Sequence, residues 1–179
     1  AFAFAKKKVP NLKLWIMGPT DEDEKYAQEC FDLVDSLGVS DIEFTGRVNV
    51  KEYLGRMDFT ILTSISEGQP LTILESYAAH KPTIATDVGN CRELIFGNDD
   101  GFGAAGILTH IMNLEEIAQA MIDLAVDPEG RKRMGEAGYK RVTSFYRIEQ
   151  MKDTYKQIYR RFADEQQIEW SEEPFELRR

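Results

Sequence analysis

The chain has 179 residues, of which 42% are hydrophobic and 30% charged, which is enough for one domain with a core and too little for two ordinary domains. Its formal charge of −9, from 31 acidic and 22 basic residues, argues against a groove that follows nucleic-acid phosphates, because such a groove needs many Lys and Arg contacts. Two scattered cysteines argue against a disulfide framework or a zinc site. No apolar stretch reaches the ~20 residues of a membrane span. We therefore expect a cytoplasmic protein without a metal or cofactor.

Apolar runs and helical patterns alternate along the first third of the chain. Residues 1–8 pass from alternating Ala and Phe to three lysines and indicate the last turns of a helix that begins further upstream. The spacing of apolar and turn residues then predicts a strand over Asn11–Gly18, a helix over Asp21–Leu37, a strand over Asp41–Thr45, a short helix over Val50–Met57 and a strand over Phe59–Ser64.

The alternation continues through the rest of the chain. After a loop over Ile65–Gln69, the pattern predicts a helix over Pro70–His80, strands over Pro82–Thr86 and Ala105–Thr109, and helices over Leu114–Val126, Glu129–Ser144 and Arg147–Asp164. Such β-α-β repeats predict an α/β fold, a Rossmann-like doubly wound parallel sheet followed by C-terminal helices. We expect one domain over residues 1–164 and an acidic tail over residues 165–179, either a docking arm or loosely ordered.

The segment from Ser64 to Pro82 is the most informative part of the chain. In a doubly wound sheet, ligands bind beyond the carboxyl ends of the strands, so the loops that follow the predicted strands should share one edge. Gly68 lets the backbone approach a ligand, and Pro70 suits the first position of a helix. The amides of Leu71 and Thr72 would then point outward from the positive end of that helix, which predicts an anion site suited to a diphosphate.

Two glutamates flank this predicted anion site. Glu67 lies in the loop before the helix, and Glu75 lies eight positions later within it. Because carboxylates repel phosphate, we expect them to accept hydrogen bonds from sugar hydroxyls, one on a ribose and one on a transferred hexose. Two alternatives stay open: Glu75 forms a capping box with Thr72, or Glu67 is an exposed loop acid that the helix dipole favours.

These residues resemble a known enzyme family. The E-x7-E spacing of Glu67 and Glu75, within SEGQPLTILESYAAHKPTIATDVGNCREL, is similar to the motif of glycosyltransferase family 4. Further matches are Gly18, the Phe44–Arg47 stretch, the Asp87–Gly89 stretch with Glu93, and the late Asp127-Pro128 and Arg141-Val142 pairs, so that the resemblance covers most of the chain. The details around Gly89–Leu94 and the Tyr155/Tyr159 helix resemble PelF-like enzymes of exopolysaccharide synthesis.

The resemblance implies the C-terminal, donor-binding half of a GT-B enzyme that transfers a hexose from a nucleoside-diphosphate sugar with retention of configuration. For PelF-like enzymes the implied donor is UDP-glucose. Glu67 would be the catalytic residue at the hexose and Glu75 would bind the ribose. The remaining implied binding residues are Gly68, Gln69, Pro70, Leu71 and Thr72 at the hexose and diphosphate, Arg47 and Val48 at the base, and Gly18 and Gly46 at the same edge.

One departure from the family concerns the diphosphate. The family places an Arg and a Lys on a strand and helix that precede Asn11, and nothing here matches them, since Lys6, Lys7 and Lys8 lie at a helix end. An N-terminal acceptor-binding domain would be a further missing partner, and a peripheral membrane-associated synthesis complex is a possible one. We therefore expect negligible sugar transfer by this chain alone, because positioning and electrostatics supply most of the rate in such reactions.

Other polar clusters favour structural roles. Asp21, Glu22 and Asp23 fall in the first turn of a predicted helix, where acids complement its dipole, and Asp99-Asp100-Gly101 is typical of a turn. His80, His110 and Cys91 lack the partners of a nucleophile. Arg92 either approaches the diphosphate or is an ordinary surface arginine.

Two other functions compete with a glycosyltransferase. A nucleotide-sugar epimerase of similar fold would need a His and an acid paired across the cleft, and the sequence offers no clear pair. A non-catalytic nucleotide-binding or scaffold module is the second alternative, and the intact Glu67/Glu75 pair argues against it without removing it.

Overall fold

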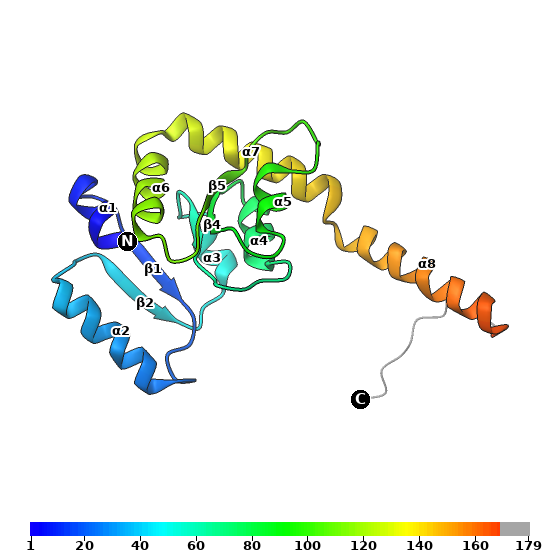
Figure 1. Cartoon of the computed structure of the whole chain (residues 1–179), viewed down its shortest axis with the longest axis horizontal. Coiled ribbons are helices and arrows are strands. Elements are labelled where there is room, and N and C mark those ends of the chain that lie inside the picture. The colour runs from blue at the N-terminus through cyan, green and yellow to red at the C-terminus, as the bar shows by residue number, and fades with distance from the viewer. Residues whose placement is uncertain (169–179) are drawn as a thin grey trace. The chain divides into compact units, whose positions relative to one another are not determined.

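The computed structural model describes residues 1–168 (Figure 1). The chain divides into two compact units, one over Ala1–Val142 and one that starts at Thr143. The elements are α1 (Phe2–Lys8), β1 (Leu14–Met17), α2 (Glu24–Leu37), β2 (Ile42–Gly46), α3 (Val50–Leu54), β3 (Thr60–Leu62), α4 (Leu71–Ala78), β4 (Thr83–Thr86), α5 (Cys91–Phe96), β5 (Gly106–Thr109), α6 (Leu114–Val126), α7 (Pro128–Phe145) and α8 (Ile148–Gln166).

The order and type of the predicted elements are confirmed, and two helices differ from the prediction. Helix α5 was not predicted, because its six residues are too short for a helical period to show. Helix α2 begins at Glu24, so Asp21 and Glu22 lie outside it instead of in its first turn. The reason is that Asp23 is the N-cap and accepts a hydrogen bond from the Tyr26 amide at 3.0 Å.

The strands form two parallel sheets instead of the single expected sheet. β1 pairs with β2, and β3, β4 and β5 pair in that order. No β1–β3 pairing occurs in the part of the chain that the structure describes. All five strands belong to the first compact unit.

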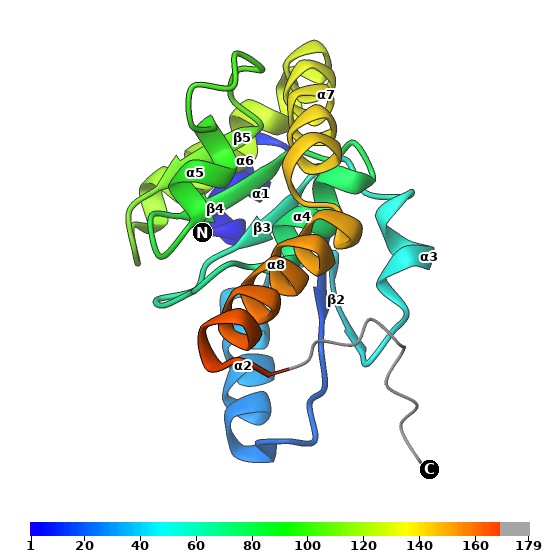
Figure 2. The same ribbon diagram turned by 90° about the vertical axis from the view of Figure 1, so that its right-hand side faces the viewer.

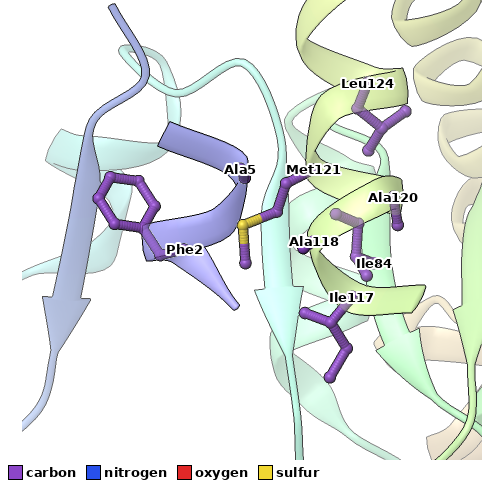
Figure 3. Packing of buried hydrophobic residues seen from close by; sticks show 8 residues of the cluster. All are labelled: Phe2, Ala5, Ile84, Ile117, Ala118, Ala120, Met121 and Leu124. Carbon is purple, nitrogen blue, oxygen red and sulfur yellow. The ribbon is translucent and has the colours of Figure 1, made fainter. Parts of the chain in front are cut away.

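Helices cover both faces of the β3–β4–β5 sheet, as expected of a doubly wound fold. Ile84 packs in a hydrophobic cluster with Phe2 and Ala5 of α1 and Met121 of α6 (Figure 3). Ile61 of β3 is partly buried and packs against the same cluster. On the other face, Ser76 of α4 contacts Thr60 of β3, with their hydroxyl oxygens 2.9 Å apart. Figure 2 shows α4 on the opposite side of β3 and β4 from α1 and α6.

Helix α7 is tied to the loop between α5 and β5 by a buried arginine. The side chain of Arg141 is 1% exposed and that of Asp100 is 4% exposed, and Arg141 Nε lies 2.6 Å from Asp100 Oδ2. The guanidinium also donates to the carbonyl oxygens of Leu94, Ile95 and Gly103 at 2.7–3.1 Å. The hydrogen bond from Arg141 holds the pKa of Asp100 below its usual value. The predicted Asp99-Asp100 turn is therefore also half of a buried ion pair.

Helix α8 belongs to the second unit and is amphipathic. Its exposed apolar side chains recur at helical spacing, namely Ile148, Met151, Tyr155, Ile158, Tyr159 and Phe162. None of the helices within residues 1–168 combines the length and hydropathy needed to cross a bilayer. Glu165 and Gln166 are part of α8, whereas residues 169–179 lie outside the described residues, so the acidic tail and the 1–164 domain boundary stay predictions.

We predict that Asp100→Asn lowers the free energy of unfolding by about 3–5 kcal/mol at pH 7, because it leaves the buried Arg141 charge uncompensated. Glu29→Gln, which removes one partner of an exposed Lys25 pair on α2, should cost less than about 1 kcal/mol. Urea unfolding of the two variants and the wild type measures both values. Similar losses in the two variants would contradict the structural role of the buried pair.

The same pair predicts a pH dependence. Because the pKa of Asp100 is lowered in the folded state, its stabilising effect is fully present above the unfolded-state pKa of about 3.9 and is lost as pH falls through the lower folded-state pKa. The stability difference between wild type and Asp100→Asn should therefore be constant from pH 5 to 7 and shrink at more acidic pH. A difference that does not change with acidification would contradict this assignment.

Candidate functional site

The candidate site is built on the connection between β3 and α4. Glu67 lies in this connection and is half-buried. Its carboxylate oxygen Oε1 accepts a hydrogen bond from the Ser64 hydroxyl at 2.7 Å, and the Ser64 carbonyl oxygen accepts one from the Thr86 hydroxyl at 2.5 Å. Ser64 therefore links the Glu67 carboxylate to Thr86 at the carboxyl end of β4.

A second contact shapes the backbone of the same connection. Gly89, in the turn between β4 and α5, has a φ of +51°, and a Cβ atom there would lie 2.1 Å from the carbonyl oxygen of Glu67. The next residue, Asn90, donates its amide to the Gly68 carbonyl oxygen at 2.9 Å. The turn after β4 thus packs directly on the Glu67–Gly68 peptide, and only glycine fits at position 89.

Helix α4 presents an uncapped N-terminus beside this connection. Pro70 is the N-cap residue, with φ −70° and ψ 115°, and no side-chain hydrogen bond caps the helix. The prediction of Pro70 as the first helical residue was therefore wrong by one position, since its extended ψ places the start of the helix at Leu71. Leu71 is 68% exposed and Thr72 is also exposed, so side chains do not bury the first turn of the helix.

Glu75 lies on the exposed face of α4. It follows Leu71 by four positions and Thr72 by three, so the three residues share one side of the helix, while Ile73, Ser76 and Tyr77 are buried. Among residues 1–168, no hydrogen bond or ion pair engages the Glu75 carboxylate. Because Pro70 is the N-cap, Thr72 lies inside the helix, and the alternative of a Thr72–Glu75 capping box is wrong.

The other predicted binding residues lie at the carboxyl ends of β1 and β2. The Gly18 amide donates to the Gly46 carbonyl oxygen at 3.0 Å, which brings these two turns together. The exposed Arg47 guanidinium pairs with Glu22 at 2.9 Å, and Val48 is half-buried. The structure therefore joins Gly18 with the Gly46–Val48 turn in one sheet and Glu67 with α4 in the other.

Charged and nucleophilic groups near Glu67 are already paired or neutral. Arg92 forms an ion pair with Asp87 at the end of β4, with Nε 3.2 Å from Oδ1, and Asp87 raises the pKa of Arg92. Burial raises the pKa of the Cys91 thiol, and the negative charges of Glu67 and Asp87 add to the effect. A raised pKa keeps the thiol protonated and weakly nucleophilic, and the lack of a catalytic role for Cys91 stays a prediction.

Both histidines have structural contacts. The His80 ring stacks on Tyr139 with a centroid distance of 3.9 Å, and its Nδ1 lies 3.3 Å from Glu136. His110 donates its amide to Glu116 at 2.8 Å and places its Nδ1 2.9 Å from the same carboxylate. The backbone hydrogen bond from His110 is the main cause of the lowered pKa of Glu116.

Three residues that shape the site were missed by the sequence analysis: Ser64 and Thr86 as hydrogen-bond partners, and Gly89 as a close contact. A usable signal existed, because Ser64 and Thr86 are polar residues that end neighbouring apolar strands. Gly89 follows the second of these strands, so it also was expected at that edge of the sheet. In a parallel sheet such residues meet at one edge.

Comparison with known proteins identifies relatives over most of the chain. Residues 1–141 match the family model described as Glycosyl transferases group 1. The chain is 31% identical over 160 residues to the putative glycosyltransferase EpsD of Bacillus subtilis (strain 168), which covers 87% of this chain and 40% of EpsD. The chain thus spans less than half the length of the relatives that it matches.

Solved structures share the fold. The C-terminal domain of the group 1 glycosyl transferase LpcC from Francisella tularensis superposes with a TM-score of 0.69 at 27% identity, over 82% of this chain and 78% of that chain. HepE of Anabaena in complex with UDP-glucose superposes with a TM-score of 0.74 at 17% identity, over 87% of this chain and 44% of that chain. At this identity the likeness to HepE shows the fold alone.

We predict that Gly89→Ala lowers the free energy of unfolding by at least about 2 kcal/mol, because it combines a left-handed backbone conformation with a backbone clash. Gly38→Ala is the matched control, because Gly38 has a φ of +59° with open space around its Cβ position and should cost about 1–2 kcal/mol. Urea unfolding measures both. Equal losses would show that the Glu67 carbonyl oxygen does not restrict position 89.

Proposed function

Because this chain belongs to the group 1 glycosyltransferases, we propose that the α4 edge binds the nucleoside-diphosphate-sugar donor of a retaining hexosyltransferase, with UDP-glucose as the donor. The observation that carries the proposal is the uncapped start of α4 beside the oriented Glu67 carboxylate. In this proposal the start of α4 supplies the donors for an anion and Glu67 supplies an acceptor for sugar hydroxyls.

The proposed diphosphate position is the first turn of α4. The backbone amides of Leu71 and Thr72 lie at the positive end of the helix, where a diphosphate is bound by hydrogen bonds and by the helix dipole. The chain carries a formal charge of −9, so its overall field opposes an anion and local donors must supply the attraction. The backbone of Gly68 and Gln69 reaches the same position from the adjoining loop.

The proposed catalytic residue is Glu67. Ser64 occupies one side of the carboxylate, which leaves acceptor positions for the hydroxyls of the hexose. In the transfer, the bond between the anomeric carbon and the diphosphate breaks with its electron pair on the diphosphate. A bond forms to the acceptor hydroxyl, whose proton passes to the departing diphosphate. Glu67 holds the hexose for this step, and the α4 amides stabilise the charge that develops on the diphosphate.

Glu75 is the proposed ribose ligand. Its carboxylate projects from the same face of α4 as Leu71 and Thr72, and no residue within 1–168 engages it. The base is proposed to lie against the backbone of Arg47 and Val48, at the edge where Gly18 contacts Gly46. The UDP-glucose bound by HepE, a structure of the same fold, supports this donor.

The acceptor is proposed to bind elsewhere in a longer enzyme, because the chain spans only 40% of the length of EpsD. The resemblance to PelF-like enzymes supports exopolysaccharide synthesis as the process. A peripheral synthesis complex at the membrane is the proposed setting of that enzyme.

We predict that the two glutamates have different effects on ligand binding. Glu75→Ala should weaken both UDP and UDP-glucose about 10- to 100-fold, because it removes a charge-assisted hydrogen bond to the ribose that both ligands share. Glu67→Ala should weaken UDP-glucose and leave UDP unchanged, because it contacts the hexose. Isothermal titration calorimetry with UDP, UDP-glucose, GDP-mannose and UDP-GlcNAc measures these affinities.

Glu29→Ala on α2 is the control, because it removes an equal charge from an exposed helix position. Equal affinities for all four ligands would favour a non-catalytic scaffold over a donor site. Unchanged UDP binding by Glu75→Ala would remove Glu75 from the site, and an equal loss of UDP and UDP-glucose in Glu67→Ala would remove Glu67 from the hexose.

A further inference from the structure

The connection between β3 and α4 leaves the sheet before it reaches Glu67. The backbone pairing of β3 with β4 ends at Leu62 and Ala85. Beyond this pair a side chain takes the place of the backbone, because the hydroxyl of Thr86, which is 0% exposed, donates to the Ser64 carbonyl oxygen at 2.5 Å. Strand β4 therefore holds the connection beyond the last paired residue of β3.

Thr86 is itself a fixed hydrogen-bond donor. It is the last residue of β4 and pairs with Thr109 of β5, and the amide of the next residue, Asp87, donates to the Thr109 carbonyl oxygen at 2.8 Å. A threonine side chain is stiff at χ1 because it is branched at Cβ, and full burial removes the competition of water for its hydroxyl. The Ser64 backbone is therefore anchored to the central strand of the β3–β4–β5 sheet.

The Ser64 hydroxyl connects this anchored backbone to the Glu67 carboxylate. It donates to Oε1 at 2.7 Å, and no other group among residues 1–168 forms a hydrogen bond or ion pair with this carboxylate. At the other end of the side chain, the Glu67 backbone is restricted by Gly89, whose Cβ position would lie 2.1 Å from the Glu67 carbonyl oxygen. Both ends of a flexible side chain are therefore fixed, and Oε2 has no partner within the described part of the chain.

We propose that Thr86 and Ser64 are positioning residues that hold Glu67 in the orientation in which it accepts a hydrogen bond from the hexose. The inference rests on the proposed function of Glu67 and adds the residues that set its direction. A glutamate that is free in the unliganded protein loses side-chain entropy when it binds a ligand, whereas one already held by Ser64 does not. For a long side chain this loss corresponds to about tenfold in affinity.

The positioning acts on the hexose alone. UDP lacks the hexose, so its affinity does not depend on the direction of the Glu67 carboxylate. If Ser64 only stabilised the connection, the effect would differ, because the connection leads into the first turn of α4, where both UDP and UDP-glucose are proposed to place the diphosphate. Loss of Ser64 would then weaken both ligands equally. The ratio of Kd for UDP to Kd for UDP-glucose therefore separates the two roles.

The test is calorimetric titration of UDP and UDP-glucose into the full chain, its Ser64→Ala and Glu67→Ala variants and the double variant. Ser64→Ala should lower the Kd ratio about 3- to 10-fold through weaker UDP-glucose binding, with UDP unchanged. In the Glu67→Ala background, Ser64→Ala should change neither affinity, because no carboxylate remains to be held. Ser36→Ala is the matched control, because the exposed Ser36 hydroxyl donates within α2, to the Leu33 carbonyl oxygen at 2.9 Å, and it should leave the ratio unchanged.

Thr86→Val extends the test to the first hydrogen bond of the series. It keeps the shape of the side chain and removes the hydroxyl that holds the Ser64 carbonyl oxygen, so the Kd ratio should fall about 2- to 5-fold. Nuclear magnetic resonance of the ligand-free protein gives a readout that needs no sugar nucleotide. The three-bond coupling constants of Glu67 should indicate a single χ1 rotamer in the wild type and averaged rotamers in Ser64→Ala.

Three results would overturn the proposal, and a fourth would remove Thr86 from it. Averaged Glu67 rotamers in the wild type would show that Ser64 does not hold the side chain, whatever the ligand is. An unchanged Kd ratio in Ser64→Ala, with a lowered ratio in Glu67→Ala, would remove the positioning role and keep the proposed function. An unchanged ratio in Glu67→Ala would remove both, because Glu67 would then not contact the hexose. An unchanged ratio in Thr86→Val alone would confine the positioning role to Ser64.

Discussion

The close approach of Gly89 to the carbonyl oxygen of Glu67 is the constraint on which the candidate site depends. It joins two connections that follow neighbouring strands, one after β3 and one after β4, without a gap for a side chain. The Asn90–Gly68 hydrogen bond lies next to this contact, so the backbone around Glu67 cannot move independently of the sheet. With the backbone held, the Ser64 hydroxyl is enough to orient the Glu67 carboxylate.

Some charged groups of the first unit are paired with each other, and others have no partner among residues 1–168. Arg92 and Asp87 neutralise each other beside the site, and Arg141 and Asp100 do so in the interior. Within residues 1–168, no side chain caps the start of α4 and no group pairs with the Glu75 carboxylate. In a chain with a large negative charge, an uncapped helix start is a local positive region, and its position next to two acids suits a ligand with both phosphates and hydroxyls.

The sheet architecture shows how far a pattern of elements determines a fold. The parallel strand directions and the pairing of consecutive strands within each half agree with β-α-β order and right-handed crossovers. The division into two sheets does not follow, because the pattern contains no information on whether β1 and β3 are neighbours. Their separation by a cavity that both strands line is seen only in the tertiary structure.

The sequence by itself determined the order of the strands and helices, the position of the loop before α4, and the two glutamates that flank it. These features depend on apolar periodicity and short spacings, which a chain carries locally. The tertiary structure decided which groups orient Glu67, that Arg92 pairs with Asp87, and that Asp100 is buried against Arg141. Thr86 and Ser64 are 22 positions apart, and Asp100 and Arg141 are 41 positions apart. Contacts over such separations arise only when packing brings distant segments of the chain together.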